Sequence, residues 1–316
     1  MRFGVIGTNF ISDRFCEAAS RSDSAEVYAI YSRKADTGHA FCQRNGGGIK
    51  VYTSYDEMLA DTLIDAVYVA SPTMCHKEHA IAALKAGKAV LCEKMICTSL
   101  DEFIEMEAAA KSTRGTLIEA MRTDFDPYAS YLGEALSKIG KLRRAHFTYC
   151  QYSSRYDAFL KGDVKNAFDP KMKNSALADI GIYPLHLAIS LFGAPLDVTS
   201  KSLFLHNGFE GAGEILMTYE GMLATVSYSK ITEGTTPSVI EGEEGSVTID
   251  SINAPTRITL NRRGEEPYTY PHHNEKNNMI FEIEGFIRAV GDPEYRDRLL
   301  STTRTVMETV EKIRPY

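Results

Sequence analysis

Two short stretches of this sequence carry polar groups in arrangements that could do chemistry. Lys94 follows Glu93 directly after an apolar run, and an ammonium at such a place can stabilise negative charge that develops on an alcohol or carbonyl oxygen. Asp179 and Tyr183 are four residues apart, so on a helix both would project from one face, about one turn from each other. A phenol and a carboxylate in that relation can hold or exchange a proton.

A third stretch could bind phosphate. An apolar run ends at Gly7, and apolar residues at helical spacing begin at Phe10. A strand, a glycine turn and a helix N-terminus form an anion site, because unpaired N–H groups and the helix dipole point at the ligand. The dinucleotide fingerprint is G-x-G-x-x-G/A, and Gly7-Thr8-Asn9-Phe10-Ile11-Ser12 keeps only its first glycine. An ordinary strand-to-helix turn is therefore an alternative interpretation.

The elements that must position these residues alternate regularly over the first 120 residues. Strand candidates separated by helical patterns occur at 2–5, 26–31, 51–52, 65–70, 89–92 and 116–120. This alternation predicts a parallel, doubly wound sheet, the Rossmann arrangement of an α/β protein, with the loops at the carboxyl ends of its strands lining one crevice. We expect neighbours there among the strand-end residues Gly7, Ser32, Ser71, Glu93 and Arg122.

After Arg122 the pattern changes to consecutive strands. A long alternating strand is predicted at 142–152, and further strand candidates with glycine-rich turns lie at 196–205, 214–219, 222–231, 238–241, 246–249 and 257–260. Two amphipathic helices, at about 276–290 and 292–313, close the chain. We predict a dinucleotide-binding Rossmann domain at residues 1–120. A substrate-binding and oligomerisation α+β domain with a largely antiparallel open sheet is predicted at 121–316.

Composition limits the possible partners. Hydrophobic residues make up 44% and charged residues 24% of the chain, and no apolar run is long enough to span a bilayer. The net charge of -7 and the lack of a basic stripe argue against nucleic acid as a partner. Met1 leads directly into a strand without a signal-peptide pattern, which favours the cytoplasm.

Cysteine and histidine positions give little support for a metal site. The six cysteines contain no C-x-x-C pair and are expected to be buried reduced thiols. His76 and His79 are three residues apart, but no carboxylate or cysteine cluster completes a ligand set. His272 and His273 are expected to be exposed to solvent. We therefore predict no metal ion.

Three blocks, in order and in spacing, resemble the glucose-fructose oxidoreductase / inositol dehydrogenase (Gfo/Idh/MocA) family, in particular its dihydrodiol dehydrogenase-like branch. They are Ser71-Pro72-Thr73 with His76, the run from Ala86 to Lys94, and the run from Ala176 to Leu185. The resemblance spans essentially the whole chain. It implies an NAD(P)-dependent oxidoreductase that transfers a hydride between nicotinamide and a hydroxyl or carbonyl carbon of a sugar, polyol or cyclic diol.

The same resemblance assigns roles to the reactive residues. Lys94 corresponds to the lysine that contacts the nicotinamide ribose and the reacting oxygen. Tyr183 corresponds to the proton donor, and Asp179 orients the tyrosine or the substrate. Inositol-dehydrogenase-like members have a histidine at the tyrosine position. His186, near the same face, is interpreted as a packed helix histidine.

Cofactor choice is predicted from the end of the second strand. NAD enzymes commonly have an acidic residue there, whereas this chain has Ser32-Arg33-Lys34 and its first acid at Asp36. This favours NADP, with NAD possible; plain surface charges are the alternative interpretation. The residues expected to contact the cofactor are Gly7, Thr8, Asn9, Phe10, Ile11, Ser32, Arg33, Lys34, Ser71, Pro72, Thr73, His76, Glu93, Lys94 and Arg122.

Three departures from the family pattern support a second hypothesis. Asn9 and Ser12 replace small fingerprint residues, Met95 replaces the proline of Glu-Lys-Pro, and Asn174-Ser175 replace a Gly-Gly pair. Loss of the proline is expected to loosen the Lys94 loop. The departures favour a non-catalytic dinucleotide-binding sensor or regulator, such as the repressor that this family includes, whereas the retained Lys, Asp and Tyr favour the enzyme. A homodimer or higher homo-oligomer is the family habit.

Overall fold

The structure is a computed structural model of the chain, and it describes residues 1–271 and 275–314. His272 and His273, predicted to be exposed, lie outside the described residues. The chain divides into two compact units, which we call unit 1 (1–122 and 275–304) and unit 2 (123–274 and 305–316). Within the described ranges, no helix combines the length and the apolar composition needed to cross a membrane.

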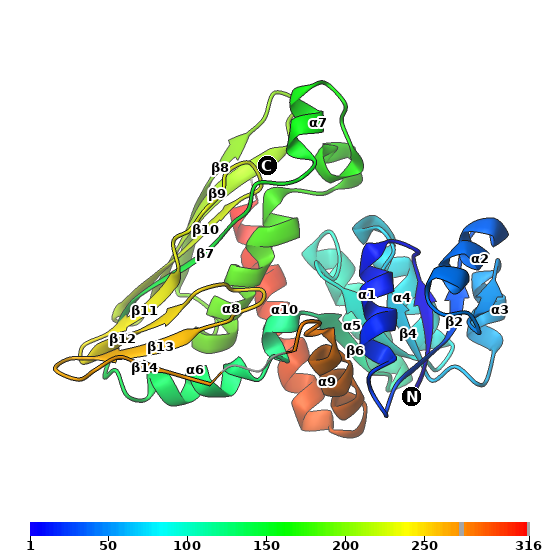
Figure 1. Ribbon diagram of the computed structural model, residues 1–316, viewed down its shortest axis with the longest axis horizontal. Coiled ribbons are helices and arrows are strands. Elements are labelled where there is room, and N and C mark those ends of the chain that lie inside the picture. The colour runs from blue at the N-terminus through cyan, green and yellow to red at the C-terminus, as the bar shows by residue number, and fades with distance from the viewer. Residues whose placement is uncertain (272–274, 315–316) are drawn as a thin grey trace. The chain divides into compact units, whose positions relative to one another are not determined.

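Unit 1 is built on a six-stranded parallel sheet in the order β3-β2-β1-β4-β5-β6 (Figure 1). Its strands are β1 (Arg2–Ile6), β2 (Glu26–Tyr31), β3 (Lys50–Tyr52), β4 (Ala66–Val69), β5 (Ala89–Glu93) and β6 (Leu117–Ala120). All four residues of β4 are buried, as a continuous apolar run in a covered parallel sheet requires. The prediction of a doubly wound sheet is confirmed.

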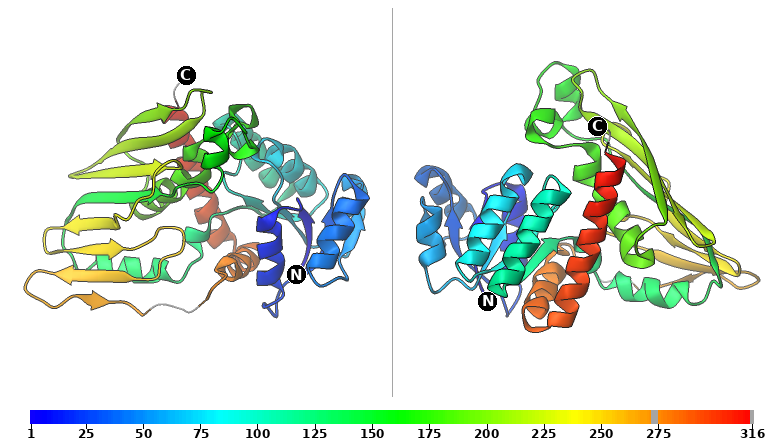
Figure 2. Two further views of the ribbon diagram at one scale, coloured as in Figure 1. Left: turned by 45° about the horizontal axis from the view of Figure 1, so that its top comes forward. Right: turned by 180° about the vertical axis from the view of Figure 1, so that it is seen from behind.

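Helices cover both faces of this sheet. They are α1 (Phe10–Ala19), α2 (Ala35–Arg44), α3 (Tyr55–Ala60), α4 (His76–Lys85) and α5 (Leu100–Thr113), with short 3-10 turns η1 (Thr73–Cys75) and η2 (Arg122–Asp124). α1 lies on one face, and α4 and α5 lie on the other (Figures 1 and 2). Phe15 of α1 stacks on Tyr68 of β4, with ring centroids 3.9 Å apart. This aromatic contact fixes the helix over the centre of the sheet.

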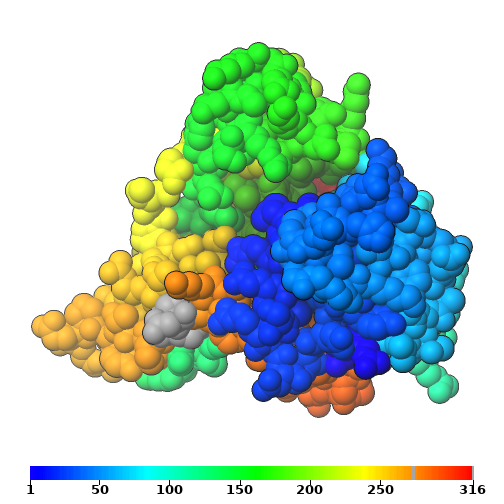
Figure 3. Space-filling view, turned by 45° about the vertical axis from the view of Figure 1, so that its right-hand side comes forward, coloured from blue at the N-terminus to red at the C-terminus, as the bar shows by residue number. Residues whose placement is uncertain are grey.

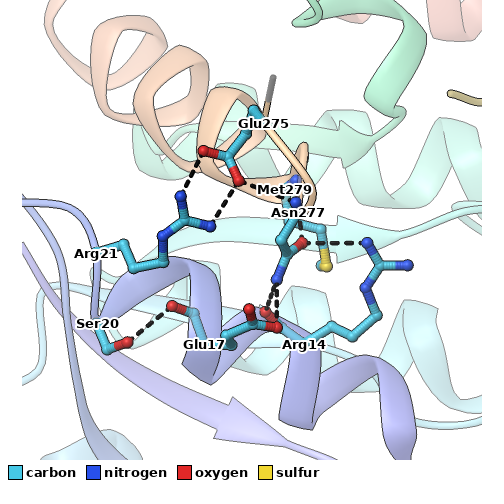
Figure 4. Close-up of polar contacts among 7 residues, drawn as sticks. All are labelled: Arg14, Glu17, Ser20, Arg21, Glu275, Asn277 and Met279. Carbon is cyan, nitrogen blue, oxygen red and sulfur yellow. Dashed lines mark hydrogen bonds and ion pairs between the residues drawn. The ribbon is translucent and has the colours of Figure 1, made fainter. Parts of the chain in front are cut away.

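Unit 1 also contains residues 275–304, whereas the sequence analysis predicted a second domain at 121–316. This segment holds α9 (Met279–Gly291) and the first part of α10 (Pro293–Ile313). Arg21 forms two hydrogen bonds with Glu275, of 2.5 and 2.6 Å, and the Asn277 amide donates to the Arg14 carbonyl at 2.8 Å (Figure 4). These contacts join the start of the segment to α1, a return that chain order alone could not predict.

Unit 2 contains an eight-stranded sheet in the order β14-β13-β12-β11-β7-β10-β9-β8. Its strands are β7 (Leu142–Cys150), β8 (Asp197–Phe204), β9 (Glu210–Tyr219), β10 (Met222–Ser229), β11 (Ser238–Gly242), β12 (Gly245–Ile249), β13 (Ile258–Arg262) and β14 (Tyr268–Thr269). All pairings are antiparallel except that of β7 with β10. The largely antiparallel sheet is confirmed, and β14 is an additional short strand that the pattern did not predict.

The helices of unit 2 gather on one face of this sheet (Figures 1 and 2). They are α6 (Tyr128–Leu136), α7 (Tyr156–Leu160) and α8 (Ile182–Phe192), with the short turns η3 (Asn166–Phe168) and η4 (Pro170–Met172) and a π-helical turn η5 (Leu177–Gly181) that leads into α8. The opposite face exposes large apolar side chains, including Leu203, Leu216 and Leu223. Half-covered antiparallel sheets commonly show this alternation of inward and outward residues.

A buried carboxyl group lies in the core of unit 1. Glu282 of α9 is fully buried, and neither of its carboxyl oxygens has a hydrogen-bond partner among the described residues. Burial raises the pKa of Glu282 to about 8, and the negative charge of Glu93 adds to this shift, whereas Arg122 and Arg14 oppose it. Glu282 is therefore protonated at neutral pH in the native state.

Replacement of this carboxyl by an amide should change how stability depends on pH. The pKa of Glu282 is raised in the native state, so the proton that an unfolded chain loses near pH 4.5 is kept until about pH 8. The contribution of Glu282 to the free energy of unfolding of the parent protein should therefore fall as the pH rises through that window, by up to about 1.4 kcal/mol per pH unit. Glu282→Gln has no proton to lose there, so this part of the pH dependence should be absent in the variant. Urea unfolding at pH 5 and pH 8 measures the difference.

Glu284→Gln is the matched control, because Glu284 lies on the same helix and is exposed. A stability difference between Glu282→Gln and the parent that stayed the same at both pH values would contradict the assignment of a neutral buried carboxyl.

Candidate active site

The turn after β1 requires glycine. Gly7 has a φ of +106°, and a Cβ atom built on it would lie 2.4 Å from the carbonyl oxygen of Ala70, at the end of the neighbouring strand β4. No L side chain fits such an approach. The backbone of Gly7 and that of Ser71 are thereby brought together, which confirms that these two strand ends are neighbours. Because Gly7 has no side chain, its backbone permits the close approach that a dinucleotide pyrophosphate needs.

Asn9 has a structural role that the sequence analysis did not assign. Its side-chain oxygen accepts hydrogen bonds from the N–H groups of Ile11 (3.1 Å) and Ser12 (3.4 Å), and its amide donates to the Ala70 carbonyl at 3.2 Å. Asn9 is thus the N-cap of α1 and also a link to β4. It occupies two N–H groups that a glycine at this position would leave open to an anion.

The neighbouring residues of this turn differ in exposure. Phe10 is exposed, whereas the Ser12 side chain is fully buried, as a small fingerprint residue packed against the sheet should be. The Thr8 carbonyl accepts a hydrogen bond from Arg44 at 2.6 Å.

Two cationic side chains follow β2. Ser32 is buried, and its hydroxyl donates to the Lys34 carbonyl at 2.9 Å, which shapes the turn. Arg33 and Lys34 are both exposed, and Lys34 is at the N-cap position of α2 (Ala35–Arg44). A pair of exposed cations beside a helix N-terminus is suited to a phosphate group.

His76 lies beneath the loops after β4 and β5. It is 1% exposed, and its two ring nitrogens lie 2.8 Å from the Ser71 carbonyl and 3.1 Å from the Met95 carbonyl. Burial lowers the pKa of His76, so the neutral ring donates to one of these carbonyls at a time. His76 links the Ser71-Pro72-Thr73 loop to the loop after β5 that contains Lys94 and Met95, which we call the lysine loop. A direct contact with cofactor, as the sequence analysis expected, would need a more exposed ring.

The lysine loop is held by buried carboxylates. Glu93 accepts hydrogen bonds from the Tyr68 hydroxyl (2.5 Å) and from the N–H of Lys94 (3.2 Å). Glu119 of β6 accepts from the N–H of Ile96 at 2.9 Å. The peptide bond between Lys94 and Met95 is cis.

Met95 stands where the family pattern Glu-Lys-Pro has its proline, and its surroundings restrain the loop. Met95 is 1% exposed, and its carbonyl is one of the two that His76 contacts. The loop is therefore anchored on both sides of Met95, which is a physical reason against the loosening that the sequence analysis expected.

Asp179 and Tyr183 lie on one helical segment of unit 2, as predicted, but not on a regular α-helix. Residues Leu177–Gly181 form a π-helical turn, and α8 begins at Ile182. Pro184 has no N–H to donate to the carbonyl four residues before it, which favours a wider turn there. The helical turn that carries Asp179 is therefore wider than the α-helix assumed in the sequence analysis.

Tyr183 lies beside a second tyrosine, Tyr149, of unit 2. It is 5% exposed, and its ring lies edge-on to that of Tyr149, with centroids 6.0 Å apart. The Tyr149 hydroxyl donates to Gln151 (3.3 Å) and accepts from the Asn253 amide (3.0 Å). The phenol of Tyr183 thus lies in a mostly buried, hydrogen-bonded neighbourhood in which proton exchange can be controlled.

Asp179 forms an ion pair that the sequence analysis missed. Its carboxylate lies 2.6 Å from the ammonium of Lys230, the residue that follows β10. The only sequence signal is a lysine at the end of an otherwise apolar and hydroxylated strand, which ordinarily indicates a solvated strand end. In the structure the Lys230 side chain is 4% exposed.

His186 has a different environment from Asp179 and Tyr183. It is fully buried, and its Nδ1 lies 3.3 Å from Asp124. This placement agrees with its interpretation as a packed helix histidine.

No cluster of three or more His, Cys, Asp or Glu side chains suited to a metal ion occurs in residues 1–271 and 275–314. The groups predicted to do chemistry are the Lys94 ammonium in unit 1, and the Asp179 carboxylate and the Tyr183 phenol in unit 2. All three suit proton transfer and charge stabilisation at an oxygen.

Comparison with known proteins shows the family of the chain. Residues 1–121 match the model of the oxidoreductase family with an NAD-binding Rossmann fold, and residues 135–248 match the GFO/IDH/MocA C-terminal domain. The chain is 38% identical over 318 residues to scyllo-inositol 2-dehydrogenase (NADP(+)) of Bacillus subtilis, covering 99% of this chain and 96% of that protein. It is 29% identical over 275 residues to mouse trans-1,2-dihydrobenzene-1,2-diol dehydrogenase, covering 84% and 79%.

Among solved structures, the 3-ketoreductase KijD10 from Actinomadura kijaniata, in complex with NADP and TDP-benzene, superimposes with a TM-score of 0.84. The match covers 97% of this chain and 95% of that one at 24% identity, so it supports the fold alone. The two family models together span most of the chain, and the relative from Bacillus subtilis spans nearly all of it. The chain therefore belongs to the Gfo/Idh/MocA family of oxidoreductases.

Proposed function

We propose that the protein is an NADP-dependent dehydrogenase or reductase whose substrate is a sugar, polyol or cyclic diol. The observation that carries the proposal is the placement of Tyr183, a mostly buried phenol on the same helical segment as the ion-paired Asp179. The related proteins that are named as NADP-dependent or as acting on inositols and dihydrodiols support the choice of cofactor and substrate class. They are enzymes, which supports turnover over a sensor role.

The exposed side chains of Arg33 and Lys34 would hold the 2′-phosphate of NADP, and the turn at Gly7 would receive its pyrophosphate. NADP, when bound, accepts or supplies the hydride at C4 of its nicotinamide. In reduction the Tyr183 phenol donates its proton to the carbonyl oxygen and becomes a phenolate, and in oxidation the phenolate takes the hydroxyl proton. Lys94 stabilises negative charge on that oxygen, and Asp179 orients the substrate or the phenol.

We further propose a cytoplasmic homodimer or higher homo-oligomer. All six cysteines are free of disulfides, which supports a reducing compartment. The open face of the unit 2 sheet supports assembly, because Leu216 and Leu223 project from adjacent strands there and are 41% and 49% exposed. Neighbouring exposed apolar residues on a sheet face are typical of interfaces.

Replacement of the proposed acid/base should abolish most of the turnover. We expect Tyr183→Phe to lower kcat by about 100-fold or more with polyols and diols, because the ring stays in place while its proton donor is lost. Absorbance at the nicotinamide band measures turnover, and NADPH titration should show unchanged binding. Tyr268→Phe, at an exposed position of unit 2, is the matched control. Unchanged turnover in Tyr183→Phe would refute the assignment.

Loss of the first cation after β2 should change cofactor preference. We expect Arg33→Ala to weaken NADP binding by about tenfold and NAD binding far less, because only NADP has the charged 2′-phosphate. Fluorescence titration with both cofactors measures the ratio. Lys85→Ala, which removes an exposed cation at the far end of α4, should leave both affinities unchanged. An equal loss for both cofactors would exclude a 2′-phosphate contact.

A charge on the open sheet face should disrupt assembly. The double variant Leu216→Asp/Leu223→Asp places two carboxylates on adjacent strands, and we expect it to sediment as a monomer while the parent sediments as a dimer or larger species. Leu63→Asp, an exposed position in unit 1, controls for added charge. Unchanged sedimentation of the double variant would place the interface elsewhere.

A further inference from the structure

Lys230 is a buried cation in unit 2 to which the reaction as proposed gives no role. Its side chain is 4% exposed, and its Nζ lies 2.6 Å from the carboxylate of Asp179. A buried ammonium is costly unless it is paired and hydrogen-bonded. The Asp179 side chain is itself 38% exposed. Within this ion pair the lysine is therefore buried in the protein, whereas the carboxylate is partly exposed to solvent.

The surroundings of Lys230 restrict where its ammonium can be. Nζ also donates to the Ala167 carbonyl at 3.1 Å, and it lies 5.0 Å and 5.4 Å from the ring centroids of Phe168 and Phe209. Both rings are fully buried in a cluster with Phe159. The chain segment drawn in green, which includes residues 156–172, forms the top of the surface in Figure 3. Two aromatic faces and a carbonyl stabilise the cation at one position.

The backbone of Lys230 is fixed as well. Its N–H donates to the Gly211 carbonyl, and its own carbonyl accepts from Ser153, both at 2.9 Å. The backbone of Lys230 is thus held between β9 and the segment that follows β7. The direction from which its ammonium reaches Asp179 is set by the sheet and not by a mobile loop.

The π-helical turn that carries Asp179 has a second attachment to the same sheet. The buried Glu210 of β9 accepts a hydrogen bond from the N–H of Leu177 at 3.1 Å, and Gly181 abuts the ring of Tyr228, where a Cβ would lie 2.6 Å away. The turn is therefore fixed at its start and at its end. Lys230 fixes the one side chain between these points that the proposed reaction uses.

We propose that Lys230 is a positioning residue, which acts through Asp179 by holding its carboxylate in one orientation and balancing its charge beside the substrate. This inference rests on the proposed function of Asp179. Misplacement of such a carboxylate by about 1 Å should cost about 10- to 100-fold in turnover. The competing explanation is that Lys230 only attaches the segment around Ala167 to the sheet.

A double-mutant cycle separates the two explanations. Lys230→Met, Asp179→Asn and the double variant are compared with the parent in kcat and in KM for NADP and for a polyol substrate, in the direction of polyol oxidation. If Lys230 acts through Asp179, Lys230→Met should lower kcat about 10- to 100-fold with an unchanged KM for NADP, and should have no further effect once Asp179 is Asn. Lys230→Arg, which keeps the charge, should retain more activity than Lys230→Met.

Two variants guard against a trivial loss of structure. Lys201→Met, at an exposed position on β8, is the matched control and should match the parent in kcat and in melting temperature. Lys230→Gln keeps a donor for the Ala167 carbonyl but no charge, and it replaces Lys230→Met in the cycle if that variant does not fold.

The outcomes are distinct. A loss in Lys230→Met that is the same size in the Asp179→Asn background overturns the positioning role and leaves the proposed function intact. Full turnover in Asp179→Asn alone would overturn the proposed role of Asp179, and the positioning role with it. Loss of the Lys230 effect in the Asp179→Asn background supports both.

Discussion

Three buried carboxylates hold the segments that carry the proposed reactive groups. In unit 1, Glu93 accepts a hydrogen bond from the N–H of Lys94, and Glu119 accepts one from the N–H of Ile96. In unit 2, Glu210 accepts one from the N–H of Leu177. A carboxylate that accepts a backbone N–H forms a stronger hydrogen bond than a neutral acceptor does, and burial makes its loss costly. The backbone beside Lys94 and Asp179 is therefore fixed by side chains that do not themselves take part in the proposed reaction.

Each of these carboxylates has a second partner that fixes its own position. The hydroxyl of Tyr68 donates to Glu93, that of Thr303 donates to Glu119, and those of Tyr228 and Ser202 donate to Glu210. Neutral donors leave the negative charge in place while they satisfy the oxygen atoms. This arrangement tolerates the replacement of Pro by Met at position 95, because hydrogen bonds supply the constraint that a proline ring would give.

The sequence predicted what depends on local pattern and missed what depends on partners distant in the chain. The four apolar residues of β4 indicated a covered parallel strand, and the types and positions of Lys94, Asp179 and Tyr183 indicated their chemistry. The buried lysine at 230 could not be predicted, because Tyr228-Ser229-Lys230 has the pattern of a strand that runs into solvent. The ion pair of Lys230 depends on Asp179, which lies on a helical turn 51 residues earlier in the chain (230 − 179 = 51).

Glu282 of α9 lies near Glu93, the last residue of β5, in unit 1. Burial raises the pKa of Glu282, and the charge of the nearby Glu93 adds to this shift, so Glu282 is protonated at neutral pH. Glu93 has hydrogen-bond donors, whereas Glu282 has none among the described residues. Helix α9 thus adds a carboxyl group beside the lysine loop without adding a second negative charge.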